Sequence, residues 1–299
     1  MTRGAHPEAG LRYDAEGFVP ALDDTPLFWG ERGAGESAVV LCDGLGCDGF
    51  AWHYLQPGLA TDRRVLHWHY RGHGRSGSPR EPERLTVGEL ARDLLGLLDA
   101  RQVERAVLAG HSLGTQVILE LYRIAPERVA GLLLVCGSSG QITRSFRGGA
   151  WLGDVLPGVR HGVRTHGEAV RALWGRLPSR VAYRLACWSG EVDAATMRPD
   201  DFRRYWDAVA HIAPETFFQL LASGGEHSAE DLLERVAVPT LVIAAERDTF
   251  TPPERARSLA ERIPGAEYFE VRGGSHAALV EQPGAVLLRI EKFLAERVR

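Results

Sequence analysis

Short apolar runs alternate with longer amphipathic stretches along most of this chain of 299 residues. The runs are rich in branched or aromatic residues and are bounded by Gly, Asp or Pro, which is typical of buried parallel strands. Between them, leucines recur at spacings of three and four, as on one face of a helix. This alternation predicts an α/β fold in which helices cover both faces of a mostly parallel, twisted sheet. The predicted strands span residues 38–42, 65–70, 105–109, 129–136, 240–244 and 267–271.

The alternation stops near Gly137 and resumes at Val238. The residues between contain several helical stretches and no convincing strand, so we expect a helical insertion that covers the sheet. The prediction is therefore one core domain, residues 1–136 and 238–299, with a helical cap at residues 137–237. Residues 17–31 hold a turn between two half-strands and predict an antiparallel hairpin at the sheet edge.

Composition excludes several classes of partner. The net charge of −4 provides no basic surface for nucleic acid. The longest apolar runs are far shorter than the roughly 18 residues of a membrane span. Residues 1–10 are polar and lack the apolar region of a signal peptide. Four cysteines are too few for a disulfide scaffold. These observations predict a cytoplasmic protein with reduced thiols.

The segment around Ser112 carries the strongest motif. A predicted strand runs into Gly-His-Ser-Leu-Gly and then into a predicted helix, which is G-x-S-x-G in the context that gives it meaning. Ser112 is then expected at the carboxyl edge of the sheet, beside a helix N-terminus that favours developing negative charge. Gly110 and Gly114 leave room for the neighbouring backbone. The pattern predicts Ser112 as a nucleophile.

A serine hydroxyl needs a base, and the base needs a group that orients it. The order expected after this type of elbow is serine, acid, histidine. Asp248 follows the predicted strand 240–244, and His276 is the only histidine after it. Glu246 is a competing carboxylate two residues earlier. We favour Asp248 because it lies further past the strand end, where a loop can direct it toward His276.

With these motifs the chain resembles the α/β-hydrolase superfamily, in the serine-nucleophile branch with a helical cap. The resemblance extends from about Gly17 to the C-terminus and includes the elbow, the acid loop and GGSHAALVEQP around His276. Residues 70–76, YRGHGRS, are similar to the D-x-R-G-x-G-x-S loop of the family. The resemblance implies that Ser112 is the nucleophile and His276 the general base and then acid. It also implies that Asp248 orients His276 and stabilises its cation.

The resemblance also implies an oxyanion hole made of two backbone N–H groups. One is that of Leu113, directly after the nucleophile, and alignment on Gly44 gives Leu45 as the other. The family usually has His-Gly here, whereas this chain has Asp43 before Gly44. A carboxylate beside an anion site hinders catalysis unless it points away or is paired, for example with Arg71. The alternative is that Asp43 serves as an acid–base group or a substrate ligand.

The histidines of residues 67–73 resemble a metal cluster, because His67 and His69 alternate onto one face of a strand. No carboxylate lies in this run, and the stretch matches the strand and turn of the family. We therefore predict no metal and no cofactor.

A serine at the elbow indicates attack on carbonyl carbon. The related haloalkane dehalogenases and epoxide hydrolases use Asp there. The leading prediction is hydrolysis of a carboxylic ester, lactone or thioester of a small to medium apolar substrate through an acyl-enzyme. The alternatives are cofactor-free haloperoxidase or perhydrolase-like chemistry, C–C bond hydrolysis, and a non-catalytic ligand receptor on the same fold. The predicted substrate-binding residues are Asp43 and the cap aromatics Trp151, Trp174, Trp188, Trp206 and Phe218.

Overall fold

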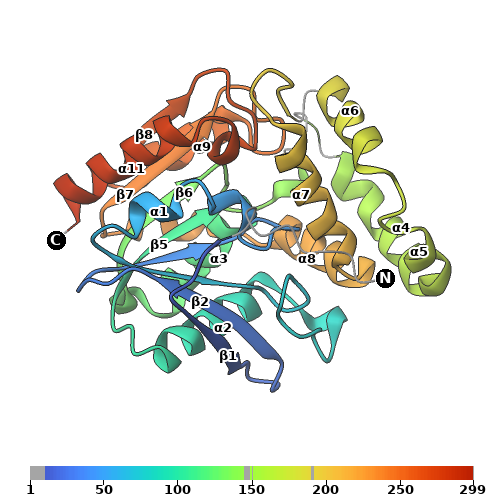
Figure 1. The fold of residues 1–299 in the computed structure, drawn as a ribbon, viewed down its shortest axis with the longest axis horizontal. Coiled ribbons are helices and arrows are strands. Elements are labelled where there is room, and N and C mark those ends of the chain that lie inside the picture. The colour runs from blue at the N-terminus through green and yellow to red at the C-terminus, as the bar shows by residue number, and fades with distance from the viewer. Residues whose placement is uncertain (1–10, 145–148, 150, 190–191, 299) are drawn as a thin grey trace.

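The structure is a computed structural model of the chain that describes residues 11–144, 149, 151–189 and 192–298. In this part of the chain one eight-stranded sheet has the order β1-β2-β4-β3-β5-β6-β7-β8 (Figure 1). The strands are β1 (Ala15–Pro20), β2 (Pro26–Arg32), β3 (Ala38–Cys42), β4 (Arg64–Trp68), β5 (Ala106–His111), β6 (Val129–Val135), β7 (Thr240–Ala245) and β8 (Glu267–Val271).

The strand pairing confirms the predicted α/β fold. The six strands β3 to β8 are parallel to one another, while β1 and β2 form an antiparallel hairpin with β1 at the edge, and β2 also pairs antiparallel with β4. Two strand ends differ from the prediction by two residues, and the other differences are of one residue. β4 ends at Trp68 because the chain already turns at Tyr70, whose carbonyl accepts from His73 N at 3.0 Å. β5 continues to His111 because β6 runs beside it, pairing His111 with Val135.

Helices cover both faces of the sheet because alternate strand residues point to opposite sides. Val40 of β3 belongs to one buried cluster with residues of α2, α3 and α9. Its neighbour Leu41 belongs to a second cluster with residues of α1, α10 and α11. These helices are α2 (Val87–Ala100), α3 (Leu113–Ile124), α9 (Pro253–Arg262), α1 (Gln56–Leu59), α10 (Ala278–Glu281) and α11 (Pro283–Arg297).

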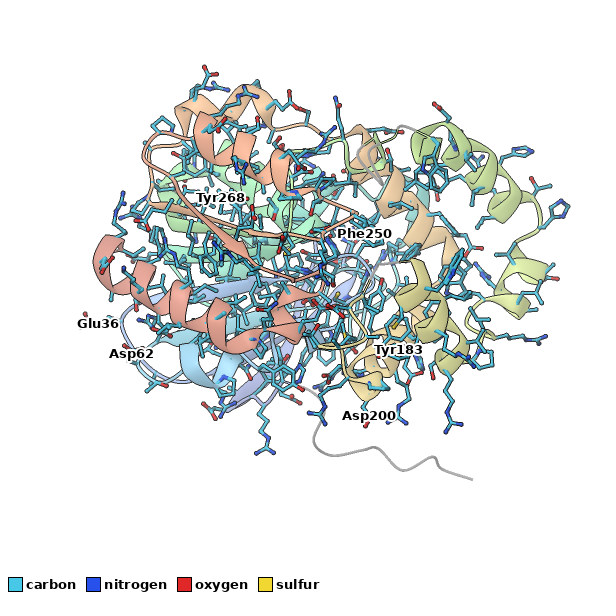
Figure 2. All side chains as sticks on the ribbon, turned by 90° about the horizontal axis from the view of Figure 1, so that it is seen from above. Glu36, Asp62, Tyr183, Asp200, Phe250 and Tyr268 are labelled. Carbon is cyan, nitrogen blue, oxygen red and sulfur yellow. The ribbon has the colours of Figure 1, made fainter. Side chains whose placement is uncertain are left out.

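The segment between β6 and β7 is helical where the structure describes it, with no strand of the main sheet there. α8 packs against α4 and α7 packs against α6, and Figure 1 shows α4 to α8 together on one side of the molecule. In Figure 2, Phe250 from the loop after β7 lies where the core meets these helices. The helices are α4 (Trp151–Thr165), α5 (Gly167–Leu173), α6 (Ser179–Ser189), α7 (Pro199–His211) and α8 (Pro214–Glu226).

Three expectations drawn from composition concern disulfide bonds, membrane-spanning helices and a signal peptide. All four cysteines are free: Cys42, Cys47, Cys136 and Cys187. Among the helices of the described residues, none combines the length and the apolar character needed to cross a bilayer. Residues 1–10, on which the expectation about a signal peptide depends, lie outside the described residues.

Candidate active site

Ser112 is the single residue between the end of β5 and the start of α3, and its backbone angles are φ 54° and ψ −116°. A positive φ is costly for a residue with a side chain, by about 1–3 kcal/mol, and such strain concentrates at functional sites. The turn is also crowded. A Cβ atom on Gly110 would lie 2.4 Å from the Gly114 carbonyl oxygen, and one on Gly114 would lie 2.4 Å from that of Cys42. Both glycines are therefore required by close backbone approach.

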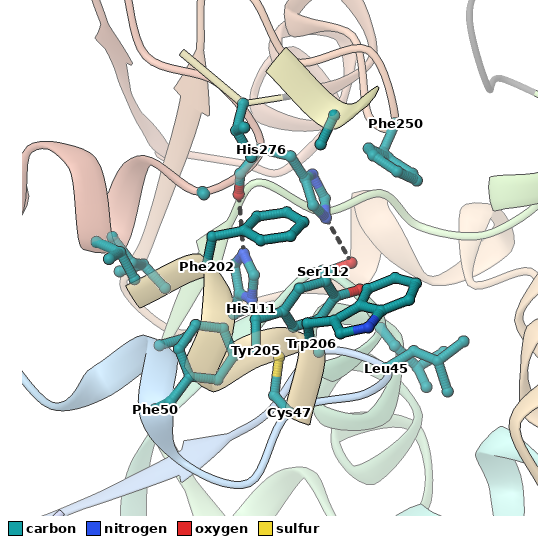
Figure 3. A pocket seen from close by; sticks show the side chains of 18 of the residues that line it. Leu45, Cys47, Phe50, His111, Ser112, Phe202, Tyr205, Trp206, Phe250 and His276 are labelled. Atoms are coloured by element: carbon teal, nitrogen blue, oxygen red, sulfur yellow. Dashed lines mark hydrogen bonds between the residues drawn. The ribbon is translucent and has the colours of Figure 1, made fainter. Parts of the chain in front are cut away.

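The structure brings Ser112, His276 and Asp248 together. His276 Nε2 lies 2.9 Å from Ser112 Oγ, and His276 Nδ1 lies 2.9 Å from Asp248 Oδ2. Figure 3 marks the first of these contacts with a dashed line. The three side chains come from the loops that follow β5, β7 and β8. Since these strands are parallel, their carboxyl ends meet at one edge of the sheet, where α/β folds hold their ligands.

Asp248 is buried and held by several donors in addition to His276. The backbone N–H groups of Phe250 and Thr251 donate to its Oδ1 at 2.9 and 2.8 Å, and the Thr251 hydroxyl donates to Oδ2 at 2.7 Å. The competing carboxylate, Glu246, accepts instead from Gly273 N at 2.7 Å. Of the two carboxylates, Asp248 is therefore the one in contact with His276.

His111, the residue before Ser112, is a site residue that the sequence analysis missed. Its Nε2 lies 3.1 Å from the His276 carbonyl oxygen, so the turn at Ser112 also holds the backbone of His276. Burial lowers the pKa of His111 to about 4, which keeps its imidazole neutral at physiological pH. Its position beside Ser112 in G-x-S-x-G was the available signal.

The loop after β3, residues 43–49, lies directly on this turn, and because it carries Leu45, one of the predicted oxyanion donors, we call it the oxyanion loop. A Cβ atom on Gly44 would lie 3.0 Å from His111 Nδ1 and 3.2 Å from Ser112 Cβ. Leu45 and Leu113 line the same cavity as Ser112. Leu113 is the first residue of α3, where backbone N–H groups lack partners within the helix. Within the described residues no acceptor is bonded to the N–H group of Leu45 either.

The structure gives Asp43 a partner other than Arg71. The pair with Arg71, suggested as one possibility, does not form, because Arg71 donates to Asp93 through two nitrogens at 2.6 and 2.5 Å. Asp43 is buried with 1% exposure, and its Oδ2 lies 2.9 Å from His67 Nε2. The carboxylate is absent from the cavity lining, so the prediction that it binds substrate there is wrong. The neighbouring strand β4 supplies His67, and this partner turns Asp43 away from the cavity.

The other histidines of the same stretch also bond protein groups. His69 Nδ1 accepts from Arg75 N at 2.7 Å, and His73 Nδ1 lies 3.1 Å from the Arg71 carbonyl oxygen. Among the described residues no group of three or more His, Cys, Asp or Glu side chains could hold a metal ion.

A cavity of about 570 Å³ opens beside Ser112 and His276. Figure 3 labels three aromatic lining residues of α7, Phe202, Tyr205 and Trp206, and a fourth, Phe250, from the loop after β7. Asp201 is the one acidic residue in the described lining, and the Tyr54 hydroxyl donates to its carboxylate at 3.1 Å. No lysine or arginine is found among these lining residues. The apolar part of the lining includes Phe50, Leu152, Leu177, Leu185, Met197, Phe202, Tyr205, Trp206, Phe217, Leu221 and Phe250.

Of the five predicted cap aromatics, only Trp206 lines this cavity. Trp188 is 86% exposed on α6, and Trp151 is half exposed on α4. Trp174 packs edge-on against Phe218 and donates its indole N–H to the Val209 carbonyl at 3.2 Å, so both aromatics belong to the packing between helices. The prediction is therefore wrong for Trp151, Trp174, Trp188 and Phe218.

The residues that replace them follow a helical pattern. Phe202, Tyr205 and Trp206 occupy positions i, i+3 and i+4 of α7 and therefore share one face. That spacing was visible in the sequence, but it does not say which face of the helix meets the cavity. Phe250 lies two residues beyond Asp248, in the same loop.

Comparisons with known proteins agree with this fold. A family model described as the alpha/beta hydrolase fold matches residues 37–283. A putative carbamate hydrolase RutD from Azorhizobium caulinodans is 32% identical over 263 residues, which cover 85% of this chain and 89% of that protein. Among solved structures, the enol-lactonase from Burkholderia xenovorans is 25% identical with a TM-score of 0.75, covering 94% of this chain and 100% of that one. A thermophilic esterase from Thermogutta terrifontis, 23% identical, has a TM-score of 0.77 and covers 94% and 98%.

Proposed function

The chain belongs to the α/β-hydrolase fold family, and we propose that it is a serine hydrolase of carboxylic esters, lactones or thioesters. The observation that carries the proposal is the contact of Ser112 Oγ with His276 Nε2 at 2.9 Å, beside a largely apolar cavity. The names of the similar proteins, a carbamate hydrolase, an enol-lactonase and an esterase, support hydrolysis at a carbonyl carbon.

The proposed reaction begins when His276 Nε2 takes the Ser112 proton and Oγ attacks the carbonyl carbon. Asp248 orients the imidazole and stabilises the imidazolium that forms. The N–H groups of Leu45 and Leu113 bind the oxyanion, and one such donor contributes about 3–4 kcal/mol. His276 then protonates the leaving alcohol or thiol. His276 then takes a proton from a water molecule, which attacks the acyl carbon, and the proton passes to Ser112 Oγ as the bond to the acyl group breaks and the acid leaves. No cofactor is required.

The lining of the cavity supports a neutral, apolar, small to medium substrate. A carboxylate or phosphate on the substrate would need a cation, and the described lining contains no lysine or arginine. We propose that residues 137–237 form a cap on the core of residues 1–136 and 238–299, with substrate bound between the two. Phe202 and Trp206 of α7 would contact the apolar part of the substrate.

A second candidate substrate class is a carbamate. It rests on the identity of 32% to the putative carbamate hydrolase. A carbamate carbonyl can be attacked by the same serine, so the two classes share one mechanism and differ in the leaving group and acyl part.

The test is a panel of p-nitrophenyl esters, lactones, thioesters and aryl carbamates with the wild-type protein and Ser112→Ala. A fluorophosphonate probe is expected to label the wild-type protein and not the variant. Turnover is expected to fall by roughly 10⁴-fold or more in Ser112→Ala. Ser223→Ala is the matched control, because Ser223 is a buried serine on α8 that accepts from Val87 N at 2.9 Å. Unchanged turnover in Ser112→Ala would refute the proposal.

A further inference from the structure

We propose that Asp43 is a positioning residue that holds the oxyanion loop through a buried polar chain to His67 and Tyr13. The inference rests on the proposed function, because it concerns the placement of the Leu45 N–H group as an oxyanion donor. It also explains how a carboxylate can lie next to an anion site without repelling the oxyanion, because Asp43 is directed away from the cavity and paired with His67.

The first link is the closure of the loop by Asp43. Its Oδ2 accepts from Gly49 N at 2.8 Å, so the side chain at the start of the loop binds the backbone at its end. The Tyr70 hydroxyl donates to the Asp43 carbonyl oxygen at 2.7 Å, which fixes the backbone of the same residue. Within the loop, Cys47 N donates to the Gly44 carbonyl at 3.2 Å. Leu45 lies between these fixed points.

The second link is the orientation of the carboxylate by His67. His67 is buried on β4, with Nε2 2.9 Å from Asp43 Oδ2 and Nδ1 2.8 Å from the Tyr13 hydroxyl. Burial, and then the nearby charge of Asp43, raise the pKa of Tyr13 well above its ordinary value, so the hydroxyl remains a donor. Tyr13 can therefore donate to Nδ1 in the tautomer that carries the His67 proton on Nε2, directed at Asp43.

The third link is the chain segment that precedes β1. Tyr13 stacks parallel to His67, with ring centroids 6.2 Å apart and an interplanar angle of 5°. A Cβ atom on Gly49 would lie 2.8 Å from Leu11 Cδ1 and 2.8 Å from His67 Cε1. Leu11 and His67 thus pack directly on the end of the oxyanion loop, on the side where Asp43 is buried.

The hydrogen bonds of the Asp43 carboxylate allow its geometric role to be tested separately from its charge. Both bonds of the Asp43 carboxylate are accepted by Oδ2, and in the described structure the buried Oδ1 has no hydrogen-bond partner. An asparagine whose side-chain oxygen takes the place of Oδ2 would keep both bonds without the negative charge. An alanine would lose both bonds. The pair Asp43→Asn and Asp43→Ala therefore tests whether the position of the acceptor is what matters.

The experiment measures kcat and KM for the best p-nitrophenyl ester in Asp43→Ala, Asp43→Asn and Tyr13→Phe. Asp43→Ala is expected to lower kcat by about 10- to 100-fold with KM within about 2-fold, because a misplaced donor affects the transition state and not ground-state binding. Asp43→Asn is expected to keep kcat within about 3-fold of the wild type. Tyr13→Phe should lower kcat by about 3- to 10-fold, again without a change in KM.

A control variant makes the outcome specific. Tyr122→Phe removes another tyrosine hydroxyl, which accepts from Ala237 N at 3.0 Å on the far part of α3, and it should leave kcat unchanged. The inference is overturned if Asp43→Ala keeps the wild-type kcat, if Asp43→Asn loses as much as Asp43→Ala, or if KM changes instead. If Asp43→Ala does not fold, the kcat and KM of Tyr13→Phe decide. Retained turnover in Ser112→Ala would instead refute the proposed function, so the two failures are distinguishable.

Discussion

The Nε2 atom of His276 lies 2.9 Å from the Oγ atom of Ser112, although 164 positions separate the two residues. The contact exists because β5 and β8 belong to one sheet and end at the same edge. His111 adds a second connection between the same loops, since its imidazole contacts the His276 carbonyl oxygen. The turn at His111 and Ser112 therefore contacts both the side chain and the backbone of His276.

Asp248→Asn is expected to lower kcat by roughly 10⁴-fold while leaving the fold intact. The amide N–H group of the asparagine can point at His276 Nδ1, which must then accept that bond without a proton. The imidazole proton moves to Nε2, and Nε2 can no longer accept the proton of Ser112. Steady-state kinetics on the best substrate of the ester panel measures this loss.

Glu246→Gln is the matched control, because the same loop offers this second carboxylate two residues earlier. Glu246 accepts from Gly273 N at 2.7 Å, and an amide oxygen can accept that bond equally well. Turnover within about 3-fold of the wild type is expected. A loss in Glu246→Gln as large as in Asp248→Asn would contradict the assignment of the acid.

The sequence pattern predicted the fold because each strand and helix follows a local period. It also predicted which loops meet, since residues after parallel strands share one edge of the sheet. The cavity aromatics were harder, because the direction of a helix face depends on packing. Trp188 and Trp206 are equally apolar in sequence, yet one faces solvent and the other the cavity. The Asp43–His67 pair requires β4 to lie beside β3, and strand order is not a local property.

The stability of the protein is expected to depend on His111 between pH 6.5 and 4. In the unfolded chain a histidine has a pKa of about 6.5, whereas burial lowers the pKa of His111 in the folded protein to about 4. Above pH 6.5 both states are neutral and His111 contributes no pH dependence. As the pH falls toward 4, only the unfolded state takes up the proton, so the free energy of unfolding decreases by about 3 kcal/mol.

Urea unfolding at pH 7, 5.5 and 4.5 measures this dependence in the wild type and in His111→Gln. The glutamine side chain can still donate to the His276 carbonyl but does not titrate. The free energy of unfolding of the variant should therefore decline less steeply with falling pH. The difference between the two slopes corresponds to the one proton that His111 takes up when the wild type unfolds. Equal slopes in the two proteins would show that His111 is not held neutral.

Gly114→Ala is expected to destabilise the protein by about 1–3 kcal/mol, because the new Cβ would lie 2.4 Å from the Cys42 carbonyl oxygen and 2.8 Å from that of Asp43. Both are backbone atoms, one of β3 and one of the oxyanion loop, so the N-terminal end of α3 must shift away from them. Thermal and urea denaturation measure the change.

Gly96→Ala is the matched control on α2, where an added Cβ meets nothing within 4 Å. A glycine to alanine change in an open helix position is expected to stabilise by about 0.5–1 kcal/mol. The two variants should therefore differ in sign. Equal stabilities for both would mean that α3 does not approach β3 as closely as described.

Trp206→Ala is expected to lower kcat/KM by about 10-fold for the more apolar, longer acyl esters and much less for acetate esters. Trp206 lines the cavity on α7, and removing part of an apolar wall costs about 1–3 kcal/mol of discrimination. Its indole N–H donates to the Leu177 carbonyl at 2.8 Å, so the ring is held in place before substrate binds.

Trp188→Ala is the control, because that ring is 86% exposed and lies outside the lining. Selectivity for acyl length should change in the first variant and not in the second. The reverse result would place the substrate on the outer face of α6 and contradict the cavity as the binding site.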